Sequence, residues 1–189
     1  MNRATSHYAN LAGRELGWCI ALNRWGARRH ALAGFRLVSR LGDGAAWYAL
    51  IASLPLWFGA SAVFASLHLG AVAIINAALY RMLKRYTRRP RPFRRHCGIV
   101  AHAAPLDEFS FPSGHTLHAV SLTALACWYF PILAIIWVPF ALAVAASRVV
   151  LGLHYPSDVL AAAVMGVAIA GLSLAAAGAL GVPHLIGAG

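Results

Sequence analysis

Three long stretches without a charged residue constrain this chain more than any other feature. No Asp, Glu, Lys or Arg occurs in 45–80, 115–147 or 159–189, which are runs of 36, 33 and 31 residues. A helix that spans a bilayer needs about 20 mostly apolar residues, and about 17 at the least. The first two runs can therefore each supply two short spans, and the third can supply one span and a tail. The sequence predicts an all-α, multi-pass transmembrane helix bundle of about five spans.

Proline, glycine and polar residues divide these runs into separate spans. The expected spans cover about 45–64, then from a turn near 66–68 to about 83, 115–130, 132–147 and about 158–180. Pro131 separates the third span from the fourth. The last span carries a ladder of small residues that suits close helix packing in lipid, namely Ala162, Gly166 and Ala170.

A basic leader, 1–44, precedes the membrane domain, 45–189. Apolar residues recur near one face of the leader at helical spacing, and arginines lie towards the flanks of that face. The apolar residues are Leu11, Trp18, Leu22 and Trp25, and the flanking residues are Arg14, Arg24 and Arg28. This pattern predicts an amphipathic helix that lies in the lipid interface. A frayed basic tail is the alternative.

The net charge of +11, with only five acidic residues, favours an anionic partner. Nucleic acid is the weakest candidate, because the basic residues crowd against apolar segments and no nucleic-acid-binding module is visible. With five spans, all 16 Lys and Arg residues fall on one side of the membrane. The positive-inside rule then places that side in the cytoplasm.

Three polar clusters lie at this same membrane face. The first is Lys84, followed after six residues by Arg91-Pro92, and the second is Pro-Ser-Gly-His at 112–115. The third is Ser147-Arg148, then His154 after five residues and Asp158 after three more. Each cluster alone has an ordinary explanation as a membrane anchor, a helix cap or a snorkelling side chain. Their joint occurrence at one face indicates a site.

The charged and glycine residues of these clusters suit a phosphate group. Lys84, Arg91 and Arg148 supply permanent positive charge, and an Arg guanidinium matches phosphate oxygens in a bidentate way. Ser113-Gly114 precede a helix start, where free backbone N–H groups favour an anion. Glycine at that place lets the backbone approach the phosphate closely.

Two histidines are the groups in these clusters that titrate near neutral pH. His115 and His154 are therefore candidates for a nucleophile and a general acid. Asp158, four residues after His154, could set the tautomer of that ring through a hydrogen bond.

The inventory of acids argues against a metal site. Two-metal phosphatases need several clustered carboxylates. Beyond Asp43 the chain has only Asp107, Glu108 and Asp158. We therefore predict chemistry that uses neither a metal nor another cofactor.

Together the three clusters resemble the signature of the type-2 phosphatidic acid phosphatase superfamily of membrane lipid phosphatases. That signature reads K-x6-R-P, P-S-G-H and S-R-x5-H-x3-D, and every position is matched, in order, over 84–158. The resemblance implies that His154 is the nucleophile and forms a phosphohistidine, that Asp158 orients it, and that His115 protonates the leaving lipid oxygen. It also implies a set of residues that hold the phosphate: Lys84, Arg91, Ser113, Gly114 and Arg148.

The resemblance implies an all-helical, metal-independent lipid phosphatase whose partners are a phospholipid or polyprenyl phosphate and the bilayer. Many bacterial members have six spans and act at the outer face of the inner membrane, whereas this sequence predicts five spans and a cytoplasmic site. We expect hydrolysis of a phosphomonoester or pyrophosphate on a polyprenyl diphosphate, phosphatidic acid or phosphatidylglycerophosphate. One alternative is phosphoryl transfer to a lipid or sugar acceptor. The other is a non-enzymatic lipid-binding or transport protein, for which polar residues should lie buried in mid-span.

Overall fold

The computed structural model describes the backbone of residues 3–180 and the side chains of residues 13–180. Within this part the chain is helical, with one isolated β-bridge between Pro90 and Phe109. The expectations for residues 1–2, for 181–189 and for the side chain of Leu11 lie outside the described residues. The helices are α1 (Arg3–Gly26), α2 (Arg29–Gly42), α3 (Ala45–Phe58), α4 (Ala62–Thr87), α5 (Pro92–Arg95), α6 (Gly114–Tyr129), α7 (Ala134–Val150) and α8 (Pro156–Ala179).

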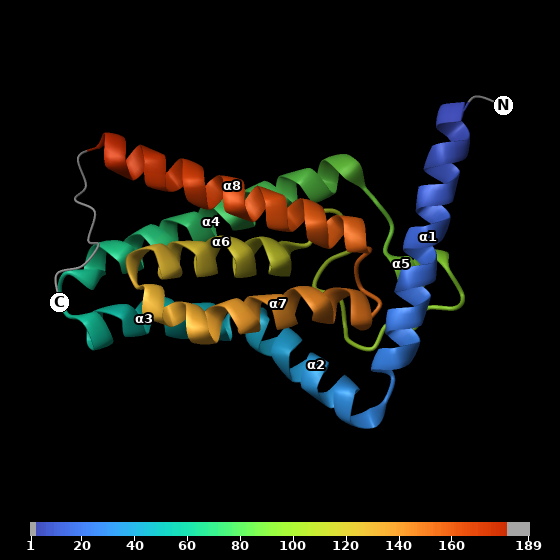
Figure 1. The fold of residues 1–189 in the computed structure, drawn as a ribbon, viewed down its shortest axis with the longest axis horizontal. Coiled ribbons are helices and arrows are strands. Elements are labelled where there is room, and N and C mark those ends of the chain that lie inside the picture. The colour runs from blue at the N-terminus through green and yellow to red at the C-terminus, as the bar shows by residue number, and fades with distance from the viewer. Residues whose placement is uncertain (1–2, 181–189) are drawn as a thin grey trace.

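Five of these helices, α3, α4, α6, α7 and α8, run alongside one another with α6 among them, and α1 crosses one end of the bundle (Figure 1). The C-terminal ends of α4 and α7 and the N-terminal ends of α6 and α8 meet at that same end. The polar segments 88–113 and 151–155 therefore lie together beside α1. The predicted all-helical membrane bundle is confirmed.

The predicted number of spans is only partly met. Among the described residues, three segments are long and apolar enough to cross a membrane: Ala62–Thr87, Pro131–Val150 and Pro156–Ala179. Helices α3 and α6 lie alongside them but have only 14 and 16 residues. The count of five spans thus stays a prediction.

The turn expected near 66–68 is wrong, because these residues lie inside α4. The helix break comes earlier, at Gly59, whose φ of 76° lies in the left-handed region that favours glycine. The polar side chains that suggested a turn are satisfied by neighbouring helices. Ser66 donates to the Ile51 carbonyl at 2.6 Å, and His68 Nδ1 lies 2.7 Å from the Tyr129 hydroxyl.

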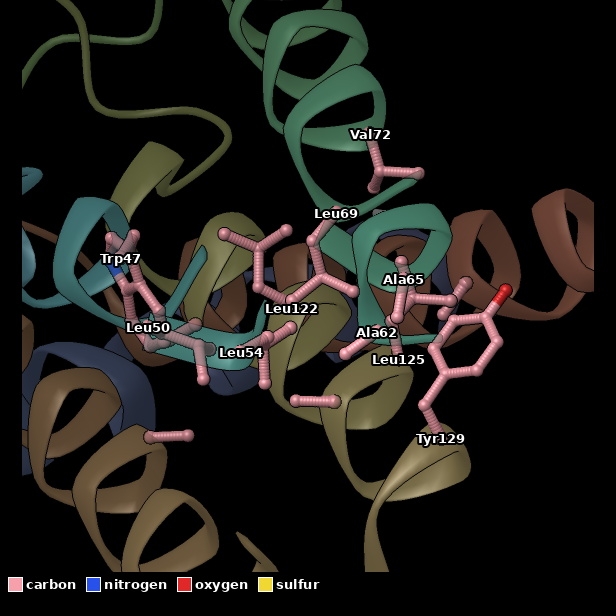
Figure 2. Close-up of a cluster of buried hydrophobic side chains, with 14 of the residues drawn as sticks. Trp47, Leu50, Leu54, Ala62, Ala65, Leu69, Val72, Leu122, Leu125 and Tyr129 are labelled. Carbon is pink, nitrogen blue, oxygen red and sulfur yellow. The ribbon is translucent and has the colours of Figure 1, made fainter. Parts of the chain in front are cut away.

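The hydrophobic core lies where α3, α4 and α6 meet, as Figure 2 shows. All three helices turn apolar side chains into it, with Trp47, Leu54 and Leu122 no more than 3% exposed. The larger apolar side chains on the outer faces of α4, α7 and α8 remain exposed, as expected for helices surrounded by lipid. Burial of these apolar side chains therefore holds α6 against α3 and α4. The Pro-Ser-Gly-His cluster lies at the start of α6.

The ladder of small residues on α8 packs as predicted. Ala162, Gly166 and Ala170 are all buried. A Cβ atom added at Gly166 would lie 3.0 Å from Val120 Cβ and 3.2 Å from the Leu117 carbonyl oxygen, both on α6. Small side chains thus let α8 approach α6 closely enough for backbone contact.

Helix α1 has one buried face and one exposed apolar face. Cys19 and Asn23 are 1% and 2% exposed and face the bundle, whereas Trp18, Leu22 and Trp25 are 58%, 40% and 46% exposed. Helix α1 therefore carries an exposed apolar stripe, of which Trp25 also contacts the Phe35 ring of α2 at a centroid distance of 6.0 Å.

Long-range hydrogen bonds tie the leader to the polar end of the bundle. The Asn23 side-chain amide donates to the carbonyls of Val100 at 2.9 Å and Val150 at 3.0 Å, and its oxygen accepts from the Val100 N–H at 2.9 Å. On α2, Ser39 Oγ accepts a hydrogen bond from Arg148 Nη1. The leader is thus part of the structure around the predicted site.

Candidate active site

A cavity of about 470 Å³ opens at the polar end of the bundle. Six of the eight residues that the sequence singled out line it: Lys84, Arg91, Gly114, His115, Arg148 and His154. Ser113 and Asp158 lie behind this wall and are fully buried. Apolar side chains from α3 and α4, among them Ile51 and Ile74, line the rest of the cavity. It therefore combines a cationic end with an apolar flank.

Lys84 and Arg91 converge on a carboxylate that the sequence had not assigned to the site. Lys84 Nζ lies 2.7 and 2.6 Å from the two oxygens of Asp107, and Arg91 Nη2 donates to Asp107 Oδ1 at 2.7 Å. Burial opposes ionisation of Asp107, but the hydrogen bonds and charges of Lys84 and Arg91 outweigh it and hold the pKa of Asp107 below its ordinary value. An anion is therefore already bound by two of the predicted phosphate ligands.

Arg148 presents a buried donor without a partner. Its side chain is 2% exposed, and Nη1 donates to Ser39, but Nε has no hydrogen-bond partner among the described residues. A buried N–H group left unpaired costs free energy, and a phosphate oxygen in the cavity would relieve that cost. Arg148 thus retains capacity to bind an anion.

The start of α6 brings Ser113, Gly114 and His115 to the cavity or close behind it. Ser113 is the N-cap, with its hydroxyl 3.4 Å from the Thr116 N–H and 2.9 Å from the Thr116 hydroxyl. A Cβ atom added at Gly114 would lie 3.3 Å from the Tyr80 ring. Ser113 therefore serves as a helix cap here, and its contact with phosphate stays a prediction.

His154 lies on the tight link between α7 and α8 and is 1% exposed. Its Nε2 is 3.3 Å from Arg91 Nη1, and its Nδ1 is 3.6 Å from Asp158 Oδ2. Burial, with the charges of Arg148, Arg91 and Lys84, places the pKa of His154 well below its ordinary value. The neutral ring that a nucleophile requires is therefore favoured at neutral pH.

Asp158 is held from several sides. Arg89 Nη1 donates to its Oδ1 at 2.6 Å, and the Tyr155 N–H donates to its Oδ2 at 2.9 Å. Arg89 also pairs with Glu15 of α1 at 3.1 Å. The carboxylate beside His154 Nδ1 is thus fixed by a network that reaches the leader.

His115 is paired with the other acid that sequence reasoning left out of the site. Its Nε2 forms a hydrogen bond with Asp43 Oδ1, from the turn between α2 and α3. His118, one turn later, instead contacts backbone carbonyls, at 3.0 Å to Gly114 and 3.1 Å to Ala73. His118 is therefore held by the backbone of α6 and α4.

Sequence reasoning missed three charged residues at the site: Asp43, Arg89 and Asp107. Asp43 and Asp107 lie outside the three sequence clusters, and Arg89 lies inside the first one but at one of its six unassigned positions. The partners of these three residues lie between 16 and 74 positions away. The sequence offered one signal, namely that the chain has only five acidic residues. With so few acids among 16 Lys and Arg residues, each acid is expected to pair with a specific cation or histidine. Among the described residues, no three His, Cys, Asp or Glu side chains cluster as metal ligands.

Comparison with known proteins gives the same picture at the level of family. Residues 65–180 match the PAP2 superfamily. The decaprenylphosphoryl-5-phosphoribose phosphatase of Mycolicibacterium smegmatis is 37% identical over 142 residues, which cover 70% of this chain and 71% of that protein. The lipid A 1-phosphatase of Rhizobium johnstonii is 31% identical over 114 residues, covering 58% of this chain and 44% of that protein.

Two solved structures share the fold. A transmembrane PAP2-type phosphatidylglycerolphosphate phosphatase from Bacillus subtilis superposes with a TM-score of 0.75 at 20% identity, covering 93% of this chain and 90% of that chain. LpxE from Aquifex aeolicus superposes with a TM-score of 0.73 at 23% identity, covering 85% of this chain and 94% of that chain. At 20% and 23% identity, the two structures show the fold of this chain alone.

Proposed function

This chain belongs to the PAP2 superfamily and is an integral membrane lipid phosphatase, and from that premise we propose that it hydrolyses a lipid phosphomonoester through a phosphohistidine on His154. The observation that carries the proposal is the cavity in which His154 and His115 meet three cationic side chains: Lys84, Arg91 and Arg148. The charged side chains and both histidines of the cavity gather at one end of the bundle, whereas the buried mid-span pair of Asn76 and Ser121 is uncharged. This distribution favours an enzyme acting at the bilayer surface over a transporter.

In the first step, His154 Nε2 attacks the phosphorus atom while the bond from phosphorus to the lipid oxygen breaks. Asp158 Oδ2, 3.6 Å from Nδ1, favours the tautomer with its proton on that nitrogen and leaves Nε2 unprotonated, so that Nε2 exchanges its contact with Arg91 Nη1 at 3.3 Å for the phosphorus. His115 gives its proton to the departing oxygen, so that the lipid leaves as an alcohol. The cations stabilise the charge on the transferring phosphoryl group, and this is where electrostatic preorganisation contributes most.

In the second step, water replaces the histidine. His115, now neutral, takes a proton from the attacking water, and the phosphorus–nitrogen bond breaks to release inorganic phosphate. Each histidine returns to its starting state. A lipid or sugar hydroxyl in place of water would give phosphoryl transfer, so the acceptor decides between the two reactions.

For the substrate, we propose a phosphomonoester on a polyprenyl-linked headgroup. The Mycolicibacterium smegmatis relative, 37% identical over 142 residues, is named for such a lipid. The apolar flank of the cavity between α3 and α4 offers a surface for a hydrocarbon chain beside the cationic end. The comparison set consists of the other candidate substrates, which are phosphatidic acid, phosphatidylglycerophosphate and polyprenyl diphosphate.

A substrate panel on the detergent-solubilised protein tests this proposal. Released phosphate is measured for a polyprenyl-phosphate-linked sugar phosphate and for each lipid of the comparison set. We expect turnover that His154→Ala abolishes and that His68→Ala leaves in place, since His68 contacts Tyr129 within the apolar core. Full activity of His154→Ala would overturn the mechanism, and label passed to an acceptor lipid rather than to phosphate would favour the transferase.

We further propose that the leader lies in the lipid interface on the cytoplasmic side of a bacterial inner membrane. Trp18, Leu22 and Trp25 are exposed on α1, which crosses the bundle at its basic end (Figure 1). Cys97 is exposed at the same end and can report on sidedness. A membrane-impermeant thiol reagent should label Cys97 only in inside-out vesicles, with Cys97→Ser as the control. Labelling from the periplasmic side would contradict this orientation.

A further inference from the structure

The carboxylate of Asp43 reaches the site from outside every motif. It lies in the Gly42-Asp43-Gly44 turn that joins α2 to α3, and its Oδ1 is hydrogen-bonded to His115 Nε2. This residue precedes 65–180, the part of the chain that matches the family. The contact therefore joins a carboxylate of the leader to a histidine of the matched region.

The turn holds Asp43 in place through bonds on both sides. The Trp47 indole N–H of α3 donates to the Gly42 carbonyl at 3.1 Å, and Trp47 itself is 3% exposed within the core. The Asp43 N–H donates to the Arg40 carbonyl of α2 at 3.3 Å. The backbone that carries the carboxylate is thus anchored to two helices, and the hydrogen bond to His115 does not depend on a free loop.

The charges around His115 give this contact a chemical consequence. Arg148 of α7, Lys84 of α4 and the ring of His154 all interact electrostatically with His115, so the ring faces two positive charges. Among the described residues, Asp43 is the acid that contacts this ring, and it brings both a hydrogen bond and the opposite charge. A histidine that donates a proton in so cationic a cavity needs a carboxylate partner that stabilises its protonated ring.

We propose that Asp43 is a positioning residue that sets the tautomer of His115 and stabilises its protonated form. Asp43 accepts a hydrogen bond from Nε2–H, which leaves Nδ1 to give a proton to the leaving oxygen and later to take one from water. This inference rests on the proposed function, in which His115 is the proton donor. It makes the leader a part of the catalytic apparatus.

The test compares two leaving groups in Asp43→Asn, Asp43→Glu and wild-type protein. Asparagine keeps the size of the side chain but removes its charge. An alkyl phosphomonoester needs a proton on its departing oxygen. The departing oxygen of p-nitrophenyl phosphate hardly needs one, because it leaves as a stable phenolate. For Asp43→Asn we expect kcat/KM on the alkyl lipid, which reports the steps up to departure of the leaving group, to fall about 10-fold to 100-fold, the range of one charge-assisted hydrogen bond. The kcat/KM on p-nitrophenyl phosphate should change less than about threefold.

The pH profile supplies a second readout that a purely structural role would not move. Without the carboxylate, the basic limb of the kcat profile on the alkyl lipid should move to lower pH, because the protonated ring loses its partner. Asp43→Glu should recover most of the alkyl activity. Glu108→Gln, at an acid that pairs with Arg94 on the surface at 3.3 Å, is the matched control and should leave both activities unchanged.

Each other outcome overturns the inference. Equal losses on both leaving groups would make Asp43 a structural residue only, and unchanged kinetics would make the contact incidental. Failure of the proposed function is distinguishable from either result, because it would appear as absent phosphate release in the wild-type protein or as full activity in His154→Ala.

Discussion

Replacing Asp107 with asparagine should make phosphate bind more tightly. It should also lower the melting temperature of the protein without phosphate. Its carboxylate accepts hydrogen bonds from Lys84 and Arg91 at 2.6–2.7 Å, and these two cations are predicted to hold the substrate phosphate. A phosphate that enters the site must share these donors or displace the carboxylate. Asp107→Asn removes the competing charge and keeps the shape of the side chain.

The size of the effect follows from the exposure of the pair. A hydrogen bond between charged groups contributes about 1.5–3 kcal/mol. The Asp107 side chain is 34% exposed, whereas those of Lys84 and Arg91 are 6% and 1% exposed, so water screens the carboxylate and the lower end of that range applies. Since about 1.4 kcal/mol corresponds to tenfold in affinity, Asp107→Asn should bind phosphate about tenfold more tightly.

The assay is calorimetric titration of inorganic phosphate into detergent-solubilised protein, together with the competitive inhibition constant of vanadate. The melting temperature of Asp107→Asn without phosphate should fall, because two buried cations lose an ionised partner, and added phosphate should restore it. Glu108→Gln, with its exposed partner Arg94, should match the wild type in both measurements. Weaker or unchanged phosphate binding by Asp107→Asn would refute the reasoning and make Asp107 a permanent support of the cations.

Three further predictions follow from the site and its surroundings. The acidic limb of the kcat/KM profile should lie below pH 6.5, because burial and neighbouring cations lower the pKa of His154, and a limb above that pH would contradict it. Gly152→Ala should cost about 1–3 kcal/mol of unfolding free energy, because φ is 75° and the new Cβ would lie 2.6 Å from the Val100 carbonyl oxygen. Gly34→Ala, in open space on α2, is its control in a denaturation assay and should cost nothing. Chelators should leave phosphate release unchanged, and a loss restored by magnesium would disprove metal independence.

The sequence predicted the helices well where charge marks their ends. Runs without charged residues located the bundle, and the positions of the arginines located its polar end. The break at Gly59 was missed because it lies inside an uncharged run, whose other glycine, Gly70, lies within α4, and only the left-handed backbone distinguishes Gly59. Ser66 and His68 suggested a turn, yet partners on α3 and α6 satisfy them within a helix.

The site was predictable as far as the motifs extend. Six of the eight chosen residues line one cavity, because the ends of α4, α6 and α7 bring separate clusters together. The partners of those residues were not predictable. Asp43 and Asp107 pair with groups 72 and 16–23 positions away, and no local spacing records such a contact. Tertiary packing of the leader and of the segment between α5 and α6 decides those pairs.

The central claim, that His154 carries the phosphoryl group, is tested most directly by trapping the intermediate. Wild-type protein is mixed with a phosphate-labelled lipid phosphomonoester, quenched in base during turnover, and digested for mass spectrometry under conditions that preserve phosphohistidine. The account predicts a phosphate on the peptide that contains His154, and none in His154→Ala. A phosphate found on His115, or steady phosphate release with no labelled peptide at any quench time, would contradict it.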